Sequence, residues 1–285
     1  GVVVLGFATA TPEMVVSAIA AWHEHLGMSV GNAIGSNIAN IGLVLGATAV
    51  VTPLVVSPCT LSHEVPAVFL SMLWVTGLVW DRILSFGDGL MIVAGFIVMI
   101  VWLCRSIQKR PHEHTAALTD SDVAEVSSNV RMASCFVLGL IAMFIGSRLM
   151  VYGAKNIAEY FGISDFIIGL SIVAIGTSLP ELAASIVAAY RGEHDIALGN
   201  VLGSNLFNML AVMAMPALIM PGTLPDSLLY RDIPVMFAIT VLMLALLLLA
   251  SGRQSSGAYS VGRCGGAVLL SSFFAYNVAL FWLGA

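Results

Sequence analysis

The chain has 285 residues, of which 59% are hydrophobic and 9% charged, with a formal net charge of −5 and only 11 lysines and arginines. Soluble domains carry about 25% charged residues, and nucleic-acid binding requires a basic surface, so this composition excludes a soluble globular enzyme and a nucleic-acid partner. Apolar residues follow one another without alternation, as in 235–250, which is unlike the strands of a transmembrane barrel. We therefore predict an all-α integral membrane protein.

In chain order, charged residues separate nine apolar segments, near 1–22, 28–52, 64–80, 88–104, 132–150, 166–190, 196–220, 233–251 and 264–284. Several of their uncharged cores have only about 16 residues, short against the ~20 of an upright transmembrane helix, so the predicted boundaries are approximate. The longest polar stretch lies between the fourth and fifth segments. We predict a first repeat at 1–107, a cytoplasmic linker at 108–131 and a second repeat at 132–285.

Two motifs occur once in each half. The sequence TATPE at 9–13 recurs as TSLPE at 177–181, and GNAIGSNIAN at 31–40 recurs as GNVLGSNLFN at 199–208, both at an offset of 168 residues. Five segments separate each position from its partner, and an odd number of membrane crossings gives the two copies opposite orientations. Transporters built from such inverted repeats bind their substrates near the bilayer midplane, between the halves, on interrupted helices.

The repeat also predicts the limits and orientation of the chain. Segment 132–150 has no counterpart ahead of residue 1, so we expect the first half to lack its first helix. Loops on the side of the linker hold seven lysines and arginines, against three on the opposite side. The positive-inside rule therefore predicts a cytoplasmic linker and an external C-terminus.

The first motif contains the most unusual acids of the chain. Of 16 acidic residues, only Glu13 and Glu181 have about nine or more uncharged residues on both sides, and they are repeat partners. A carboxylate at membrane depth is costly, and its usual role is in an ion or proton pathway. The threonine four residues before each glutamate lies on the same helix face, and the preceding proline frees a backbone carbonyl. Each half thus offers carboxylate, hydroxyl and carbonyl oxygens together.

The second motif predicts a polar stripe with positions i, i+4 and i+8 on an otherwise apolar helix. Its members are Asn32, Ser36 and Asn40 in the first half and Asn200, Ser204 and Asn208 in the second. They are either ion ligands or hydrogen-bonding groups that join helices. The paired glycines Gly31 and Gly35, and Gly199 and Gly203, are expected to permit close helix packing.

The available donors favour a hard cation. Oxygen ligands that include carboxylates suit Ca²⁺, whereas a transition metal would require histidine or cysteine. All six histidines lie in loops or at segment ends, and we assign no metal to His112 and His114. The four cysteines are widely separated and are expected to be small buried apolar residues.

Both duplicated motifs resemble those of the cation/Ca²⁺ exchanger superfamily, which includes the sodium/calcium exchangers, and in particular its short bacterial members. The resemblance implies ten helices in two inverted halves, of which about nine are present here. It implies Glu13 and Glu181 as central ligands. The surrounding ligands implied by the resemblance are Thr9, Thr177, Ser178, Ser36, Asn40, Ser204 and Asn208, with carbonyl oxygens from Gly6 and Ala174.

The chain departs from the family pattern at three places. Ala10 stands where the family usually has the serine that Ser178 provides in the second half, so one hydroxyl ligand is lost. Asn208 stands where some members carry aspartate, which leaves two carboxylates at the centre. The calcium/proton branch typically has a glutamate after the Gly-Asn pair, and neither copy of the motif has one here.

These residues predict a secondary antiporter that exchanges Ca²⁺ for Na⁺ by alternating access at a midplane site, and not an enzyme. A Ca²⁺/H⁺ antiporter is the alternative, and a cation channel a more remote one, because channels usually build acidic rings from several subunits. The expected partners are the transported ions and the lipid bilayer, with no cofactor, and no obligatory protein partner is evident. The resemblance implies a multi-pass protein of the bacterial inner membrane.

Overall fold

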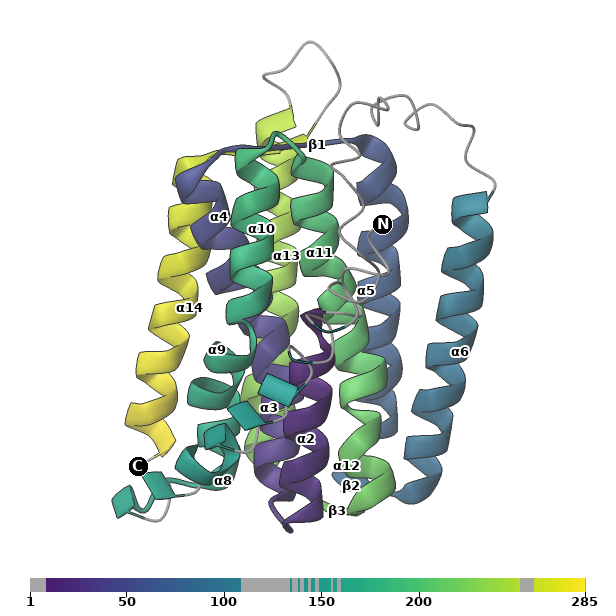
Figure 1. Cartoon of the computed structure of the whole chain (residues 1–285), viewed down its shortest axis with the longest axis vertical. Helices are drawn as coiled ribbons and strands as arrows, with labels where there is room; N and C mark the ends of the chain where they lie inside the picture. Colours follow the sequence, from purple (N-terminus) through teal and green to yellow (C-terminus); the bar gives the residue numbers. More distant parts are fainter. Residues whose placement is uncertain are drawn as a thin grey trace.

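The computed structural model describes residues 9–108, 160–251 and 259–284, together with 134, 138, 141, 142, 145, 146, 149–154, 156 and 157. Helices in this part run roughly along one axis (Figure 1), and six are long and apolar enough to cross a membrane. The prediction of an all-α membrane fold is confirmed. Gly6 and nearly all of the predicted linker lie outside the described residues.

The first half follows the predicted segments closely. Its elements are α2 (Thr11–Trp22), α3 (Leu26–Ala39), the π-helix η1 (Asn40–Leu45), α4 (Gly46–Val51), β1 (Leu54–Val56), α5 (Pro58–Leu78), β2 (Ile83–Leu84) and α6 (Phe86–Gln108). The start predicted for α5, near 64, is wrong by six residues. Pro58 suits the first turn of a helix, and the Ser57 hydroxyl caps that turn by accepting from the Thr60 amide at 3.4 Å.

The second half repeats this order. Its elements are α8 (Asp165–Ile168), η3 (Gly169–Val173), α9 (Ala174–Thr177), α10 (Leu179–Tyr190), α11 (His194–Phe207), η4 (Asn208–Val212), α12 (Ala214–Ile219), β3 (Gly222–Thr223), η5 (Leu228–Asp232), α13 (Ile233–Ser251), β4 (Tyr259–Val261) and α14 (Arg263–Gly284). Predicted segment 166–190 is thus a helix interrupted at Ser178.

The halves have opposite orientations, as the repeat predicts. We call the end with the antiparallel pair β1–β4 the upper end and the end with β2–β3 the lower end. In Figure 1, α2 lies toward the lower end and α10 toward the upper end. The turns that follow these helices share one geometry, because Glu24 (φ 67°) and Gly192 (φ 79°) both take the left-handed conformation, 168 positions apart.

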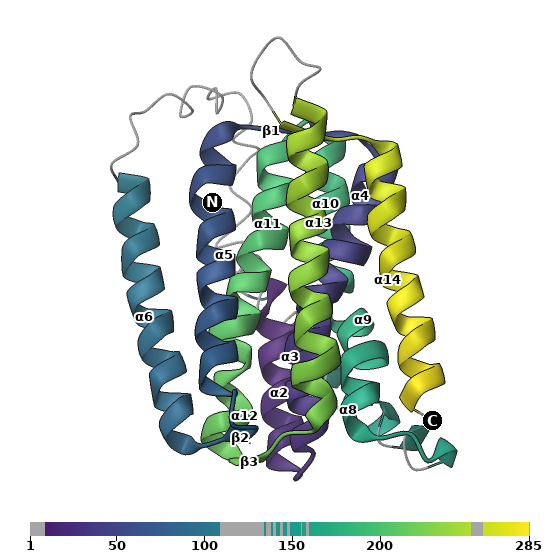
Figure 2. The same ribbon diagram turned by 180° about the vertical axis from the view of Figure 1, so that it is seen from behind.

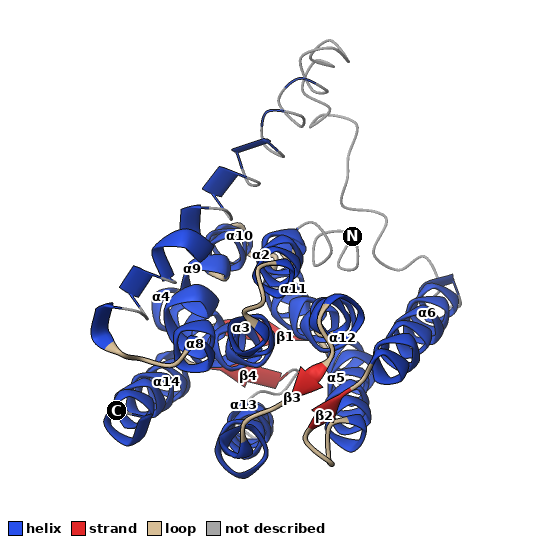
Figure 3. Ribbon diagram, turned by 90° about the horizontal axis from the view of Figure 1, so that it is seen from below, coloured by secondary structure: helices blue, strands red, loops and turns tan. Residues whose placement is uncertain are grey.

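Close packing of α3 depends on its glycines. Seen along the axis in Figure 3, α3 lies inside the bundle, beside α8. A Cβ atom on Gly31 would lie 2.5 Å from the carbonyl oxygen of Phe166, and one on Gly35 would lie 2.5 Å from that of Leu170. The two backbones therefore touch, and the packing role predicted for these two glycines is confirmed.

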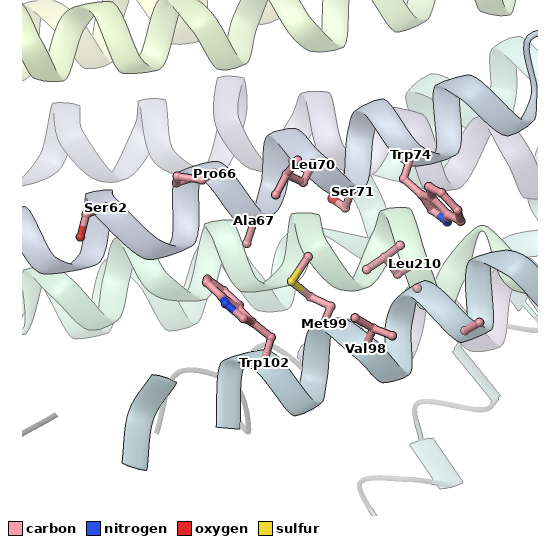
Figure 4. A pocket seen from close by; sticks show the side chains of 12 residues that line it. Ser62, Pro66, Ala67, Leu70, Ser71, Trp74, Val98, Met99, Trp102 and Leu210 are labelled. Atoms are coloured by element: carbon pink, nitrogen blue, oxygen red, sulfur yellow. The ribbon is translucent and has the colours of Figure 1, made fainter. Parts of the chain in front are cut away.

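The outer helices are less closely packed. Figure 2 shows α13 in front of the bundle, with α6 and α14 at opposite sides. An apolar cavity of about 600 Å³ lies between α5 and α6 (Figure 4). Its lining includes Pro66, Trp74, Met99 and Trp102, and contains none of the predicted ion ligands.

The prediction of buried cysteines is wrong for Cys264, which is exposed. This residue lies in the first turn of α14, where the position that packs against α4 is not Cys264 but Gly266, whose Cβ atom would lie 2.7 Å from the Gly46 carbonyl oxygen. Nothing is described of the side chains of the other three cysteines.

Candidate ion-binding site

Both predicted glutamates lie in the first turn of a helix that begins inside the protein. α2 begins after Ala10 (φ −79°, ψ −1°), and α10 begins after Ser178 (φ −84°, ψ 1°). Pro12 and Pro180 occupy the first turn, where an amide hydrogen has no partner within the helix. The T-x-x-P-E spacing therefore starts a new helix and places its carboxylate beside the interruption.

The two carboxylates are buried and unpaired. Glu13 and Glu181 are each 0% exposed, and none of their four carboxylate oxygens has a hydrogen-bond partner among the described residues. The two side chains lie within electrostatic range of each other. Burying such a charge costs several kcal/mol unless it is compensated. The pair therefore requires a cation or protons between the halves.

Asp232 shows how the same chain satisfies a buried acid that has a structural role. It is also 0% exposed, but it accepts hydrogen bonds from Arg231 Nε at 2.8 Å, from Arg231 Nη2 at 3.2 Å and from the Tyr276 hydroxyl at 2.8 Å. The Tyr276 bond joins η5 to α14. Glu13 and Glu181 have no comparable partners among the described residues, which distinguishes them from a buried acid with a structural role.

Threonine hydroxyls link the interrupted helix of each half to the motif helix of the other. Thr177 Oγ1 donates to Asn32 Oδ1 at 3.1 Å and lies 3.4 Å from Ser36 Oγ. Thr177 thus joins α9 to α3. The structure brings together two of the predicted ligands, Thr177 and Ser36, from opposite halves.

Thr9, the repeat partner of Thr177, makes the equivalent contacts on the other side of the site. Thr9 Oγ1 donates to Asn200 Oδ1 at 3.2 Å and lies 3.2 Å from Ser204 Oγ. Thr9 and Ser204 both lie within interaction range of the Glu181 carboxylate. The predicted hydroxyl ligands therefore form two equivalent pairs, each shared between the halves.

Asn32 and Asn200 join helices. They are 0% and 1% exposed, and their side chains are fully engaged. Each amide nitrogen donates to a glutamate carbonyl and a serine hydroxyl of its own half: Asn32 to Glu13 O at 3.2 Å and Ser17 Oγ at 2.9 Å, and Asn200 to Glu181 O at 3.3 Å and Ser185 Oγ at 3.0 Å. The serines were not predicted, although their 168-residue offset marks them in the sequence.

Asn40 and Asn208 differ from the other members of the stripe. Both are 0% exposed, and neither the nitrogen nor the oxygen of either amide has a partner in the described part of the chain. Each is the first residue of a π-helix, η1 or η4, a feature that is frequent at functional sites. The hydroxyl of Ser178 is likewise buried and unpartnered. These three predicted ligands are available to an ion.

The predicted carbonyl ligand Ala174 is already engaged. Its oxygen accepts a hydrogen bond from the Ser178 amide at 3.1 Å and lies 3.3 Å from Thr177 Oγ1, whose single hydrogen has Asn32 Oδ1 at 3.1 Å as an alternative acceptor. A carbonyl oxygen has two lone pairs. When Thr177 donates to Asn32, one lone pair of the Ala174 oxygen is therefore open to an ion, and Gly6 lies outside the described residues.

Two further asparagines at the interface were missed. Asn37 and Asn205 are 0% exposed, and Asn205 Nδ2 donates to the Asn37 carbonyl at 3.5 Å. They are 168 positions apart, so equivalent residues of the two halves meet at the axis that relates them. Both motif copies contain this asparagine, which is the signal that identifies it in the sequence.

The donors brought together suit an oxygen-coordinated ion. Within the described ranges, no group of three or more histidine, cysteine, aspartate or glutamate side chains comes together. The site therefore offers two carboxylates among hydroxyl and amide groups, the ligand types that hard cations prefer.

Comparison with known proteins agrees with this geometry. The family model described as sodium/calcium exchanger protein matches residues 1–105 and 132–282. CaxA of Alkalimonas amylolytica is 38% identical over 283 residues, covering 99% of this chain and 87% of its own. The inner membrane protein YrbG of Escherichia coli K12 is 34% identical over 286 residues, covering 99% of this chain and 86% of its own.

Solved structures also match the fold of this chain. The sodium-calcium exchanger NCX_Mj, soaked with 100 mM Na⁺ and 10 mM Sr²⁺, superposes with a TM-score of 0.69 at 31% identity, covering 99% of this chain and 85% of its own. The inverted repeats, the paired glutamates and these matches agree. The chain belongs to the sodium/calcium exchanger family of membrane cation antiporters.

Proposed function

We propose that the protein exchanges Ca²⁺ for Na⁺ by alternating access at the site between its halves. The observation that carries this proposal is the pair of buried carboxylates of Glu13 and Glu181, one from each half, whose oxygens have no hydrogen-bond partner among the described residues. Two negative charges balance one Ca²⁺, and they also balance monovalent cations. The two kinds of ion compete for the same charges, so each binds when the other has left.

The proposed ligand set combines both repeats and offers more groups than the six to eight oxygens that one Ca²⁺ takes, so a single Ca²⁺ uses only part of it. Its members are the carboxylates of Glu13 and Glu181, the hydroxyls of Thr9, Thr177, Ser36, Ser178 and Ser204, and the amide oxygens of Asn40 and Asn208. Carbonyl oxygens of Gly6 and Ala174 complete it. No cofactor is part of this proposal.

The hydrogen bonds between halves give a physical basis for alternating access. Thr9 and Thr177 each attach an interrupted helix of one half to the motif helix of the other. An ion that takes these hydroxyls as ligands alters the attachment on its own side. Ion binding is thereby coupled to the relative position of the halves.

Two relatives support sodium and calcium as the ions. The sodium/calcium exchanger MaX1 of Methanosarcina acetivorans is 27% identical and covers 99% of this chain. NCX_Mj has been studied with Na⁺ together with Ca²⁺ or Sr²⁺. Exchange of Ca²⁺ for H⁺ is the second candidate, since the same unpartnered carboxylates accept protons.

Counter-ion dependence of uptake tests the function. The full-length protein is reconstituted into liposomes loaded with Na⁺ or choline, and ⁴⁵Ca²⁺ uptake is measured at equal pH inside and outside. We expect uptake only with internal Na⁺. Uptake driven by a pH gradient without Na⁺ would establish the proton antiporter, and uptake without any counter-ion would establish a channel.

We also propose that the upper end faces the cytoplasm of a bacterial inner membrane. Among the described residues, Arg105, Arg191 and Arg263 lie at this end, and Arg82 and Arg231 lie at the lower end. A membrane-impermeant maleimide should therefore fail to label the exposed Cys264 in intact cells. It should label a cysteine introduced as Asp226→Cys at the lower end, and the reverse pattern would contradict the orientation.

A further inference from the structure

The side-chain amide of Asn32 is held in a single orientation. Its nitrogen lies 3.2 Å from the Glu13 carbonyl oxygen, which can only accept, so the NH₂ group must face this oxygen. The second amide hydrogen goes to Ser17 Oγ at 2.9 Å, because the hydrogen of that hydroxyl is itself donated to the Ser29 carbonyl at 3.2 Å. The amide oxygen of Asn32 is therefore left facing Thr177 of the other half, as a pure acceptor.

Thr177 has one hydroxyl hydrogen and several acceptors within reach. Asn32 Oδ1 and the Val173 carbonyl oxygen both lie at 3.1 Å from its Oγ1, and the Ala174 carbonyl oxygen lies at 3.3 Å. Donation to Ala174 would occupy a carbonyl that belongs to the proposed ligand set. Donation to Asn32 leaves the lone pairs of the hydroxyl and one lone pair of this carbonyl open to an ion. The position of a single hydrogen thus decides whether two of the proposed ligands are available.

Asn200 repeats this arrangement in the second half. Its nitrogen donates to the Glu181 carbonyl at 3.3 Å and to Ser185 Oγ at 3.0 Å, and Ser185 Oγ donates to the Ala197 carbonyl at 3.4 Å. Its amide oxygen accepts from Thr9 Oγ1 at 3.2 Å. Thr9 also lies within interaction range of the Glu181 carboxylate, which competes for the same hydrogen. A cation bound to the carboxylate removes this competition, so the hydrogen then goes to Asn200.

We propose that Asn32 and Asn200 are positioning residues that orient the hydroxyls of Thr177 and Thr9 for ion binding. Each asparagine takes up the hydroxyl hydrogen, so that the hydroxyl oxygen presents its lone pairs to the cation. The cation in turn polarises the O–H bond and strengthens its donation to the amide oxygen. This inference rests on the proposed function, because it takes both threonines as ion ligands. Neither asparagine belongs to the proposed ligand set, so each acts through a threonine of the other half.

A double-mutant cycle between Asn32 and Thr177 tests this role. The full-length protein is reconstituted into liposomes, and the internal Na⁺ concentration that gives half-maximal ⁴⁵Ca²⁺ uptake is measured. Asn32→Leu keeps the shape of the side chain and removes its oxygen, so we expect this concentration to rise about tenfold, while uptake at saturating Na⁺ stays within about threefold. Thr177→Val should have a similar effect. The double variant should be no worse than Thr177→Val, because the hydroxyl through which Asn32 acts is already absent.

Thr48→Val is the matched control for the loss of a buried hydroxyl. Thr48 is 0% exposed and donates to the carbonyl four residues earlier, Val44, at 2.7 Å, as Thr177 does to Val173, and we expect its removal to leave the Na⁺ requirement within about twofold.

An unchanged Na⁺ requirement in Asn32→Leu, or independent effects that multiply in the double variant, would overturn the positioning role and leave Na⁺/Ca²⁺ exchange intact. If Asn32→Leu fails to fold, the equivalent cycle of Asn200→Leu with Thr9→Val decides the same question. Absence of Na⁺-driven uptake by the unmodified protein would instead overturn the proposed function.

Discussion

Replacing either Glu13 or Glu181 with glutamine is expected to reduce Ca²⁺ transport at least about 100-fold, which corresponds to about 2.7 kcal/mol. Glutamine keeps the size of the side chain and one oxygen, but it removes half of the negative charge that compensates a dehydrated divalent ion. Both carboxylates are buried, and neither has a hydrogen-bond partner in the part of the chain that the structure describes. Removing one carboxylate charge therefore weakens the binding of the transported ion directly.

The double variant is expected to be hardly worse than either single variant, because residues that act on one ion as a unit are not additive. Initial rates of ⁴⁵Ca²⁺ uptake, at matched amounts of reconstituted protein, measure the effect. Glu24→Gln is the control, since Glu24 is an exposed acid in the turn after α2 and should leave uptake unchanged. Near-normal coupled uptake by either single variant would show that the duplicated glutamates are structural.

Adding one methyl group at Gly35 is expected to destabilise the fold by about 1–3 kcal/mol. A Cβ atom there would lie 2.5 Å from the carbonyl oxygen of Leu170 and 2.8 Å from the Ala174 Cβ, so α3 must move away from η3 and α9. These backbones cannot yield as a flexible side chain does. The same displacement would separate Ser36 from Thr177, so transport should fall together with stability.

Gly77 provides the matched control for this substitution. It lies within α5, and a Cβ atom at this position would meet no atom within 4 Å. Gly77→Ala should therefore be neutral or stabilising by up to about 1 kcal/mol, the usual helix-propensity gain. Thermal unfolding of the detergent-solubilised protein, followed by loss of the monodisperse species, compares the two variants. Equal unfolding temperatures would contradict the close contact between α3 and η3.

The asparagine stripe shows where sequence reasoning reached its limit. Periodicity places Asn32 and Asn40 on one face of a helix and makes them equivalent. In the structure, Asn32 is fully bonded to α2 and to the opposite half, while Asn40, at the start of η1, has no partner within the described ranges. Helical periodicity specifies the helix face on which a side chain lies, whereas the packing of the helices determines whether that side chain has a hydrogen-bond partner.

The sequence by itself determined the class of the molecule, its inverted repeat and the pairing of Glu13 with Glu181 as repeat partners. The apolar composition of the chain indicates that its surface faces lipid. An ungapped offset of 168 residues relates Glu13 to Glu181, and this relation can be recognised without knowing any contact in the structure. The tertiary structure alone decided which groups meet across the halves. The contact of Thr177 with Asn32 and the packing of Phe207 over Ala10 join residues far apart in the chain, and no local pattern encodes such an approach. The physical reason is that local sequence sets periodicity and turns, whereas a partner from the other half is chosen by how two complete repeats pack together.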